Sequence, residues 1–393
     1  MAESAQGIEL RFAMFGHKGM VTGLAWEPHG RVLASIALDG SLRFWDANSG
    51  QTVKDVEASD RGLIALAWAP EGEAVATGGE EQVIRIWSFP GAQPMGQLDG
   101  LERATTAMGW SPSGKNLVTT THGRLLYIWD IRGHKLMNTL KGHTQFPKGV
   151  SFSVRGDFLA TGSDGSRVRL WKGGAFNPDK VLEGHTAAIN MSAWSSNELL
   201  ATASDDHTVK IWDIKKGTCL QTLTDHANAV KAVAFSGDGR ILASRSWDQT
   251  IRIWRCDTWE TVAVLQEDTA SPWPTLSFHP RKPLLASVGI SDQVIRVWEL
   301  NIDHLSIAEP NDTPVSFYDQ ELMLLKAQGV DGLGMPRAQL QPRMPAGDPA
   351  YITCPECSAP ISERQVVNRQ SYGFDHIVCP VCETIIQFED ETA

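Results

Sequence analysis

Two groups of residues in this chain of 393 residues have the types and the spacing that chemistry requires. The first is the run Asp205-Asp206-His207 within LLATASDDHTVKIWD, which is compatible with an acid–base cluster, half of a metal site, or a turn. The second group forms two CxxC pairs near the C-terminus: Cys354, Cys357, Cys379 and Cys382. The chemistry open to each group depends on the elements that hold it.

The stretch around Asp206 recurs along the chain. Each copy ends an apolar segment of strand length with a tryptophan, at intervals of 41 to 44 residues. The seven tryptophans are Trp45, Trp87, Trp129, Trp171, Trp212, Trp254 and Trp298. Within a copy, turn residues separate short apolar segments, as is typical of a four-stranded antiparallel blade. A period in the forties therefore predicts an all-β, seven-bladed propeller over residues 1–300.

Two dipeptides mark several copies. Gly-His opens a copy and Trp-Asp closes its third strand, as at Gly184-His185 and Trp212-Asp213. With these motifs the first 300 residues resemble a WD40 propeller. In that family a histidine, a Ser or Thr, an Asp and the tryptophan form a buried hydrogen-bonded tetrad. The resemblance implies three complete tetrads: His17, Ser35, Asp39 and Trp45; His185, Thr202, Asp206 and Trp212; and His226, Ser244, Asp248 and Trp254.

The resemblance gives Asp206 a structural role. A buried carboxylate or imidazole is costly unless it finds a partner, and the tetrad supplies one. We therefore expect Asp206 to be an acceptor within the fold and not a catalytic group, with Asp205 and His207 as exposed turn residues. The second, third and seventh copies lack the histidine. Gly123 and Gly165 replace the Asp of the third and fourth copies, so these blades should depend more on apolar packing.

The last blade needs a strand from elsewhere in the chain. The seventh copy ends at Trp298 with three strands and no fourth in phase. The segment 8–14 precedes Gly16-His17 as the fourth strand of one copy precedes the Gly-His pair of the next. We expect this N-terminal strand to complete the last blade and so to protect its edge.

Members of the family usually meet partners at the face where the central channel opens. The positions that the resemblance places there are Met20, Thr22, Leu38, Ile64, Glu80, Thr106, His122, Phe146, Lys148, Asp164, Asn190, Asp205, Lys231, Trp247, Pro272, Pro274 and Ser291. Aromatic side chains carry much of the energy at protein interfaces. The candidate partner-binding residues are therefore Met20, Phe146, Trp247 and Trp273. Packing against neighbouring loops is the alternative for the two tryptophans.

The propeller period stops after Leu300. Residues 301–350 are rich in Pro, Gly and Gln and are interpreted as a linker, within which 319–329 has the pattern of a short helix.

In residues 351–393 the four cysteines have the spacing of a four-thiolate zinc site, and the CPxC turns resemble a zinc ribbon. Four thiolates leave no open coordination position, so a zinc ion there would be structural. An iron centre and a redox dithiol are the alternatives. Cys219 and Cys256 are expected to be buried small apolar residues.

Composition and motifs argue against several classes of protein. A net charge of −11 argues against a broad nucleic-acid footprint, and no apolar run is long enough to cross a bilayer. The first residues lack the basic start and apolar core of a secretory signal, which favours a cytoplasmic protein. We find no nucleophile elbow, phosphate-binding loop or open metal site.

The sequence thus predicts a non-catalytic scaffold with a structural zinc ribbon that assembles proteins into a complex. The alternatives are an accessory subunit that positions substrate or metal for a partner enzyme, and a nucleic-acid-associated factor that reads through its ribbon.

Overall fold

A computed structural model describes residues 7–196, 198–267, 273, 275–289 and 293–301, together with the backbone of four short strands between 351 and 387. The chain divides into two compact units, Met1–Val330 and Asp331–Ala393. All the regular elements within the described residues are β-strands. No helix in that part of the chain is long and apolar enough to cross a membrane.

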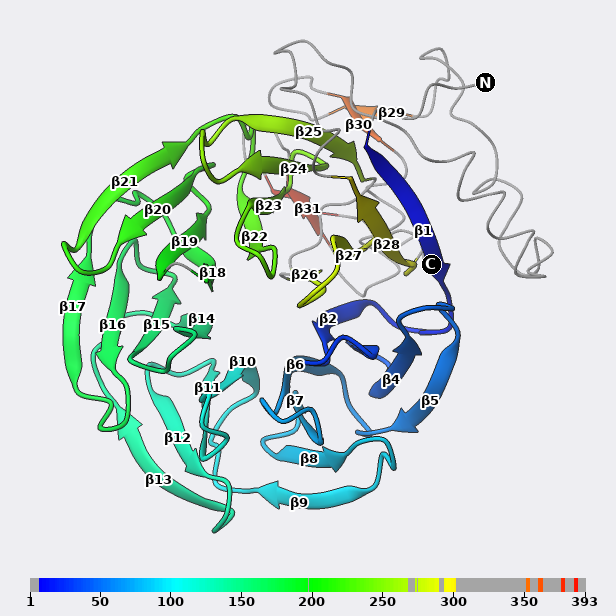
Figure 1. Ribbon diagram of the computed structural model, residues 1–393, viewed down its shortest axis with the longest axis vertical. Coiled ribbons are helices and arrows are strands. Elements are labelled where there is room, and N and C mark those ends of the chain that lie inside the picture. The colour runs from blue at the N-terminus through cyan, green and yellow to red at the C-terminus, as the bar shows by residue number, and fades with distance from the viewer. Residues whose placement is uncertain are drawn as a thin grey trace. The chain divides into compact units, whose positions relative to one another are not determined.

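The first unit contains seven four-stranded antiparallel sheets, which follow one another around a ring (Figure 1). Blades 1 to 4 are made by β2 (Val21–Trp26), β3 (Val32–Ala37), β4 (Ser41–Asp46) and β5 (Thr52–Glu57); β6 (Leu63–Trp68), β7 (Ala74–Gly79), β8 (Ile84–Ser88) and β9 (Pro94–Leu98); β10 (Thr105–Trp110), β11 (Asn116–Thr121), β12 (Leu126–Asp130) and β13 (Lys135–Leu140); and β14 (Pro147–Phe152), β15 (Phe158–Ser163), β16 (Val168–Lys172) and β17 (Pro178–Leu182).

The remaining blades have the same order, with the innermost strand first. Blades 5 to 7 are made by β18 (Ile189–Trp194), β19 (Leu199–Ser204), β20 (Val209–Asp213) and β21 (Thr218–Leu223); β22 (Val230–Phe235), β23 (Ile241–Ser246), β24 (Thr250–Arg255) and β25 (Thr261–Gln266); and β26 (Leu276–Phe278), β27 (Leu284–Val288), β28 (Ile295–Leu300) and β1 (Ile8–Met14). The seven-bladed all-β prediction is confirmed.

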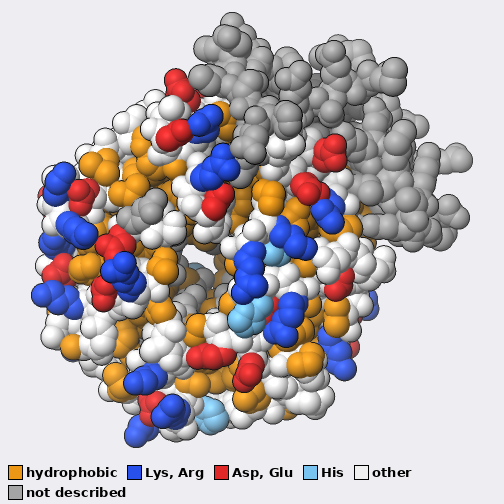
Figure 2. All heavy atoms as spheres, in the orientation of Figure 1, with side chains coloured by type: hydrophobic (Ala, Val, Ile, Leu, Met, Phe, Trp, Pro, Cys, Tyr) orange, Lys and Arg blue, Asp and Glu red, His pale blue; other side chains and the backbone are white. Residues whose placement is uncertain are grey.

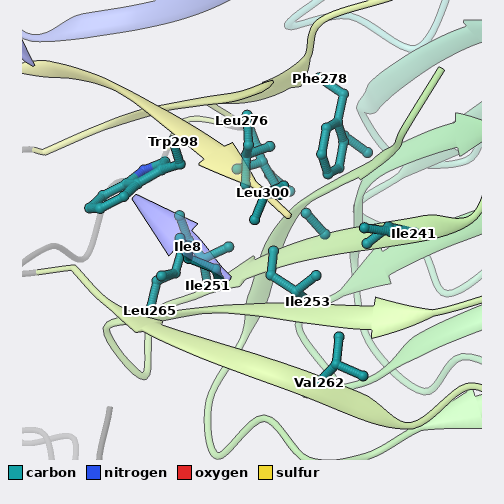
Figure 3. Packing of buried hydrophobic residues seen from close by; sticks show 14 of the residues in the cluster. Ile8, Ile241, Ile251, Ile253, Val262, Leu265, Leu276, Phe278, Trp298 and Leu300 are labelled. Carbon is teal, nitrogen blue, oxygen red and sulfur yellow. The ribbon is translucent and has the colours of Figure 1, made fainter. Parts of the chain in front are cut away.

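The N-terminal strand β1 supplies the outermost strand of blade 7. It pairs antiparallel with β28, and Leu10 lies opposite Trp298. Figure 3 shows Ile8 of β1 near Trp298 and Leu300 of β28, in a cluster that also contains Ile251 of β24 in blade 6. The first and last strands of the propeller are therefore joined by backbone hydrogen bonds and by a shared core.

The hydrophobic core lies between neighbouring blades. One cluster, for example, combines Val32 and Phe44 of blade 1 with Leu63, Trp68 and Val75 of blade 2. This arrangement explains the sequence pattern, because a strand that is covered by sheets on both sides needs apolar residues on both of its faces. The outermost strands are the exception. Cys219 on β21 is exposed, so its expected burial is wrong, while Cys256 is half-buried.

Tryptophans at the ends of first strands link adjacent blades. Each donates its indole N–H to a carbonyl on the first strand of the preceding blade, a role that the sequence did not suggest. The bonds are Trp26 to Ser277 at 3.1 Å, Trp68 to Ala25 at 3.0 Å, Trp110 to Ala67 at 3.1 Å and Trp194 to Ser151 at 3.1 Å. The Trp26 bond joins blade 1 to blade 7 and so contributes to closure of the ring.

The described part of the second unit consists of two hairpins. In one, β29 (Tyr351–Thr353) pairs with β30 (Pro360–Ser362), and in the other β31 (His376–Val378) pairs with β32 (Ile385–Gln387). Each hairpin brackets one CxxC pair in sequence. Cys354, Cys357, Cys379 and Cys382 themselves lie outside the described residues, as does the linker 302–350, so the zinc ribbon stays a prediction.

Candidate functional site

The apparent acid–base cluster in blade 5 is a structural tetrad. Trp212 Nε1 donates to Thr202 Oγ1 at 2.8 Å, and this oxygen lies 2.8 Å from His185 Nε2. His185 Nδ1 lies 2.7 Å from Asp206 Oδ2. Because an indole N–H can only donate, the Thr202 hydroxyl can donate to the imidazole, which in turn donates to Asp206.

The electrostatics of Asp206 follow from these bonds. Burial alone would raise the pKa of this carboxyl, but hydrogen bonds from His185 and Thr208 outweigh burial and lower it. The carboxylate is therefore ionised and fully engaged within the blade. His207 is exposed and has a left-handed φ of 69°, as suits the tip of a tight turn.

Blades 6 and 1 contain the other two predicted tetrads. In blade 6, His226 lies 2.7 Å from both Ser244 Oγ and Asp248 Oδ2, and Trp254 donates to Ser244 at 2.8 Å. Blade 1 differs in its last link. There His17 Nε2 lies 2.6 Å from Ser35 Oγ, which also accepts from Trp45 at 2.8 Å.

The last link of the blade 1 tetrad runs through an extra hydroxyl. His17 Nδ1 lies 2.7 Å from Ser41 Oγ and 3.7 Å from Asp39 Oδ1. Ser41 Oγ donates to Asp39 at 2.6 Å, and the amide of Lys18 adds a second bond to the carboxylate at 2.6 Å. Thus the structure brings together all twelve residues of the predicted tetrads, with Ser41 as an addition in blade 1.

The bond between hydroxyl and tryptophan persists in the blades that lack a full tetrad. Thr77 accepts from Trp87 at 2.9 Å, Thr119 from Trp129 at 3.0 Å, Thr161 from Trp171 at 3.0 Å and Ser287 from Trp298 at 2.9 Å. In blade 4, His143 Nε2 lies 2.7 Å from Thr161, but Gly165 occupies the position of the acid. Burial, together with the nearby Arg169 guanidinium, lowers the pKa of His143 to about 4.

Blade 7 uses a buried glutamate that the sequence did not suggest. Ser287 donates to Glu267, whose second oxygen lies 3.3 Å from Arg245 Nε. Arg245 also donates to Thr275 Oγ1 and to the Val288 carbonyl at 2.6 Å. One signal was available in the sequence: ILASRS places an arginine in a second strand at a position where the other blades have small or apolar residues or threonine.

The candidate partner-binding residues are assigned to one face by strand register. Because the first and second strands of a blade are antiparallel, the start of one meets the end of the other, as where Val230 lies opposite Ser246. We call the side of the ring on which the first strand of each blade begins the start face. In blades 4 to 6 it includes Phe146, Lys148, Asp164, Asn190, Asp205, Lys231 and Trp247.

Charged residues on the start face are paired, in one case across two blades and in another within one blade. Lys231 of blade 6 donates to Asp205 of blade 5, which also accepts from Asn190 at 2.7 Å. In blade 4, Lys148 Nζ lies 2.5 Å from Asp164. Burial lowers the pKa of Lys231, opposed by its hydrogen bond to Asp205. Asp205 is therefore half-buried and paired, and its expected role as an exposed turn residue is wrong. The contact was hidden from the sequence because it joins two repeats.

Two aromatic residues are exposed on the start face. The side chain of Trp247 is 37% exposed, and Lys231 Nζ lies 3.7 Å from its ring centroid. Phe146 is 45% exposed and packs edge-on against the His122 ring at 6.4 Å. Met20 and Trp273 are only partly exposed, and Pro272, Pro274 and Ser291 lie outside the described residues. Of the four candidates, Trp247 and Phe146 are thus the two with exposed side chains.

The described residues contain no group of three His, Cys, Asp or Glu side chains that could hold a metal ion. The face of the ring seen in Figure 2 carries basic and acidic side chains interspersed around the central opening. This mixture differs from the single-sign surface that a broad nucleic-acid footprint requires.

Comparison with protein families agrees with the repeat spacing. The family described as WD domain, G-beta repeat, matches residues 93–130, 134–172, 176–213 and 217–255. The chain carries WD40 repeats. Each of these matches covers the outermost strand of one blade and the first three strands of the next, so the WD40 repeat and the blade are offset by one strand. Residues 11–71 also match the Anaphase-promoting complex subunit 4 WD40 domain.

Several curated proteins share parts of the WD40 region. Periodic tryptophan protein 2 of Arabidopsis thaliana is 31% identical over 120 residues, which is 30% of this chain and 13% of that protein. Nuclear distribution protein nudF 2 of Aspergillus clavatus is 52% identical over 62 residues, 16% of this chain and 14% of that protein. WD repeat-containing protein VIP3 of A. thaliana is 35% identical over 117 residues, 29% of this chain and 36% of that protein. The matched stretch therefore spans about a third or less of each relative.

Proposed function

We propose that this protein is a non-catalytic interaction scaffold whose propeller binds partner proteins through the start face. The observation that carries the proposal is the exposure of Trp247 and Phe146 on a face where the neighbouring charges are already paired. Lys231 holds the Trp247 ring in place, so little side-chain entropy is lost on binding. Such rigid aromatic anchors are typical of interaction hot spots.

In this proposal the tetrad acids and histidines of blades 5 and 6 have structural roles. Asp206 and Asp248 are each bound to a histidine of the same blade, and those histidines are in turn bound to a buried hydroxyl. The groups are therefore saturated by partners within the fold and have no free position for a substrate proton.

In this proposal the C-terminal region is a second, separate module. Cys354, Cys357, Cys379 and Cys382 would hold a structural zinc ion, and each CxxC pair is bracketed by the strands of a hairpin. A module this small buries little apolar surface, so metal would contribute much of its stability. Together the two modules would join components of a cytoplasmic complex.

The test is affinity capture of the full-length chain followed by quantitative mass spectrometry. Proteins that bind the start face should be lost with a Phe146→Ser/Trp247→Ala variant. They should remain with Val53→Ser/Leu220→Ser, which alters residues of similar exposure (47% and 49%) on outermost strands. A second capture without residues 351–393 identifies proteins that depend on the ribbon. Equal capture by all four forms would refute the proposal.

A further inference from the structure

A buried histidine links blade 7 to blade 1, where the ring closes. We call the contact between these two blades the closing junction. Their first strands, β26 and β2, lie next to each other there (Figure 1). His279 follows β26 and is 1% exposed, and its Nε2 lies 3.0 Å from the carbonyl oxygen of Gly30 in blade 1. Its ring also packs on Trp26 of blade 1, with the centroids 4.9 Å apart. One imidazole therefore bonds the two ends of the propeller together.

Hydrogen bonds fix the protonation state of this imidazole. The backbone amides of Arg281 and Lys282 lie 3.0 and 2.9 Å from His279 Nδ1. Because a backbone amide can only donate, Nδ1 must accept, and the ring proton must lie on Nε2. The Nε2–H then donates to the Gly30 carbonyl. The closed junction therefore requires a neutral imidazole, since a proton on Nδ1 would point at two amide donors.

The ring has little room to move away from these partners. Gly30 has a left-handed φ of 76°, and a Cβ added there would collide with the imidazole of His279. The ring thus lies directly against the backbone of blade 1, with Trp26 beside it. A proton on Nδ1 has to be accommodated by moving the two blades apart.

The equivalent residues of the other blades do not titrate near neutral pH. The residue after the first strand accepts a backbone amide of the next turn in five other blades, and blade 2 has Ala69 there. A serine hydroxyl does not titrate in this range, whereas histidine has its usual pKa near 6.5. Hydrogen bonds to Arg31 outweigh burial and lower the pKa of Glu27. The five acceptors are Glu27, Ser111, Ser153, Ser195 and Ser236.

The surrounding charges act on His279 in both directions. Burial, with the nearby cations Lys282 and Arg281, lowers its pKa, and the Gly30 hydrogen bond and Glu27 oppose this shift without cancelling it. The open form therefore binds the proton first as the pH falls, so the junction is most stable above pH 6.5 and weakens below it. The other titratable groups of the junction have partners of their own: Arg31 bonds to Glu27, Arg281 to His29 Nδ1, and Lys282 to Asn48, close to Asp46.

We propose that His279 makes the closing junction acid-sensitive, so that its protonation at Nδ1 separates blade 7 from blade 1 and loosens the ring there. The proton comes from solvent, and no covalent bond changes. This inference goes beyond the scaffold proposal and does not depend on which face binds partners.

Hydrogen–deuterium exchange of the full-length protein, read by mass spectrometry at pH 7.5, 6.5 and 5.5, provides the test. Protection of β2 and β26, corrected for the intrinsic pH dependence of amide exchange, should fall by up to about tenfold from pH 7.5 to 5.5. The contact between blades 2 and 3 is the internal control. It has the same type of indole bond, from Trp110 to Ala67, and no histidine hydrogen bond crosses it among the described residues. Its protection should fall much less.

Two variants assign the effect to one histidine. His279→Gln keeps a donor and an acceptor but does not titrate, so the fall in protection at the closing junction should disappear. His29→Gln is the matched control, because His29 is the exposed histidine of the same junction and bonds to Arg281. This variant should keep the full fall.

Three results would overturn the inference. The first is an equal fall in protection at the closing junction and between blades 2 and 3, which would indicate global unfolding. The second is a fall that persists in His279→Gln, and the third is a fall that His29→Gln abolishes. The comparison of the two contacts in the natural protein, with His29→Gln, decides the question even if His279→Gln does not fold.

Discussion

Arg245 and Glu267 form an ion pair inside the propeller, where the two residues are only 2% and 3% exposed. Arg245 lies on β23 of blade 6, and Glu267 follows β25 and accepts a hydrogen bond from Ser287 of blade 7. A buried charge is costly to desolvate and persists only with its counter-charge and hydrogen bonds in place. The pair therefore joins blade 6 to the blade that closes the ring.

Removing one charge of this pair should be strongly destabilising. Glu267→Gln keeps the size of the side chain but deprives Arg245 of its counter-charge, so the free energy of unfolding should fall by about 3–5 kcal/mol. Urea unfolding followed by tryptophan fluorescence measures the change. The double variant Arg245→Met/Glu267→Leu should recover much of the loss, because no isolated charge remains. A loss below about 1 kcal/mol in the single variant would show that the pair is not needed.

The second-strand hydroxyl should matter more in a blade with a histidine than in one without. Thr202→Val deprives both His185 and Trp212 of a partner and should cost about 2–4 kcal/mol. Thr77→Val deprives only Trp87 and should cost about 1–2 kcal/mol. The two threonines are equally buried, so each serves as the control for the other. Equal losses would mean that the histidine adds nothing to the stability of the blade.

Blade 4 should accept the acid that it lacks. The Gly165 amide donates to Ser163 Oγ at 3.2 Å, as the Asp206 amide does to Ser204 at 3.1 Å, and the nearest atom to an added Cβ is that hydroxyl at 3.3 Å. In Gly165→Asp the new carboxylate would reach His143 as Asp206 reaches its histidine. We expect a gain of about 1–2 kcal/mol near neutral pH.

The same variant should change the response to acid. In the natural chain the pKa of His143 is about 4, below its usual 6.5, so the unfolded state binds this proton first as pH falls. The stability that neutral His143 contributes to the folded state is therefore complete above pH 6.5. It is lost as the pH falls from 6.5 to about 4. A carboxylate partner raises the folded pKa and narrows this gap.

Unfolding by urea at pH 7 and pH 5 tests this prediction. The gain from Gly165→Asp should be larger at pH 5. Gly123→Asp in blade 3 is the control, because in that blade Leu101 takes the tetrad position that His143 has in blade 4. If the gain in stability from Gly165→Asp does not change with pH, it does not arise from a contact with His143.

Closure of the ring should depend on the packing of β1. Leu10 is 6% exposed and lies opposite Trp298, so Leu10→Ala should lower the free energy of unfolding by about 2–4 kcal/mol. The adjacent residue Glu9 is exposed, and Glu9→Ala should change stability little. Thermal melting of the two variants provides the comparison. Equal melting temperatures would mean that β1 contributes no packing to blade 7.

The blades and their tetrads could be predicted because their signals lie within one repeat. The interval between Ser35 and Trp45, or between Thr202 and Trp212, is set by one hairpin and recurs with it. A strand that lies between two sheets also leaves a run of apolar residues that is visible without knowledge of its neighbours.

Contacts between repeats could not be predicted in the same way. The partner of Asp205 is Lys231 of the next blade. The partner of Arg245 is Glu267, which lies in the connection between blade 6 and blade 7. Such pairs require the relative rotation of two sheets, which no local pattern reports. Cys219 shows the same limit, since its exposure depends on its place in the outermost strand.

Zinc should stabilise the C-terminal module without affecting the propeller. We expect purified protein to contain stoichiometric zinc by elemental analysis, and Cys354→Ser/Cys357→Ser to lose it, because a four-thiolate site needs both CxxC pairs. Limited proteolysis should then cleave the variant within residues 351–393 faster than the natural protein. The melting temperature of the propeller should not change, and Cys219→Ser, which alters an exposed cysteine of the first unit, should retain zinc. Full zinc content in the double variant would exclude the proposed ligands, and iron in place of zinc would assign the site to the iron centre.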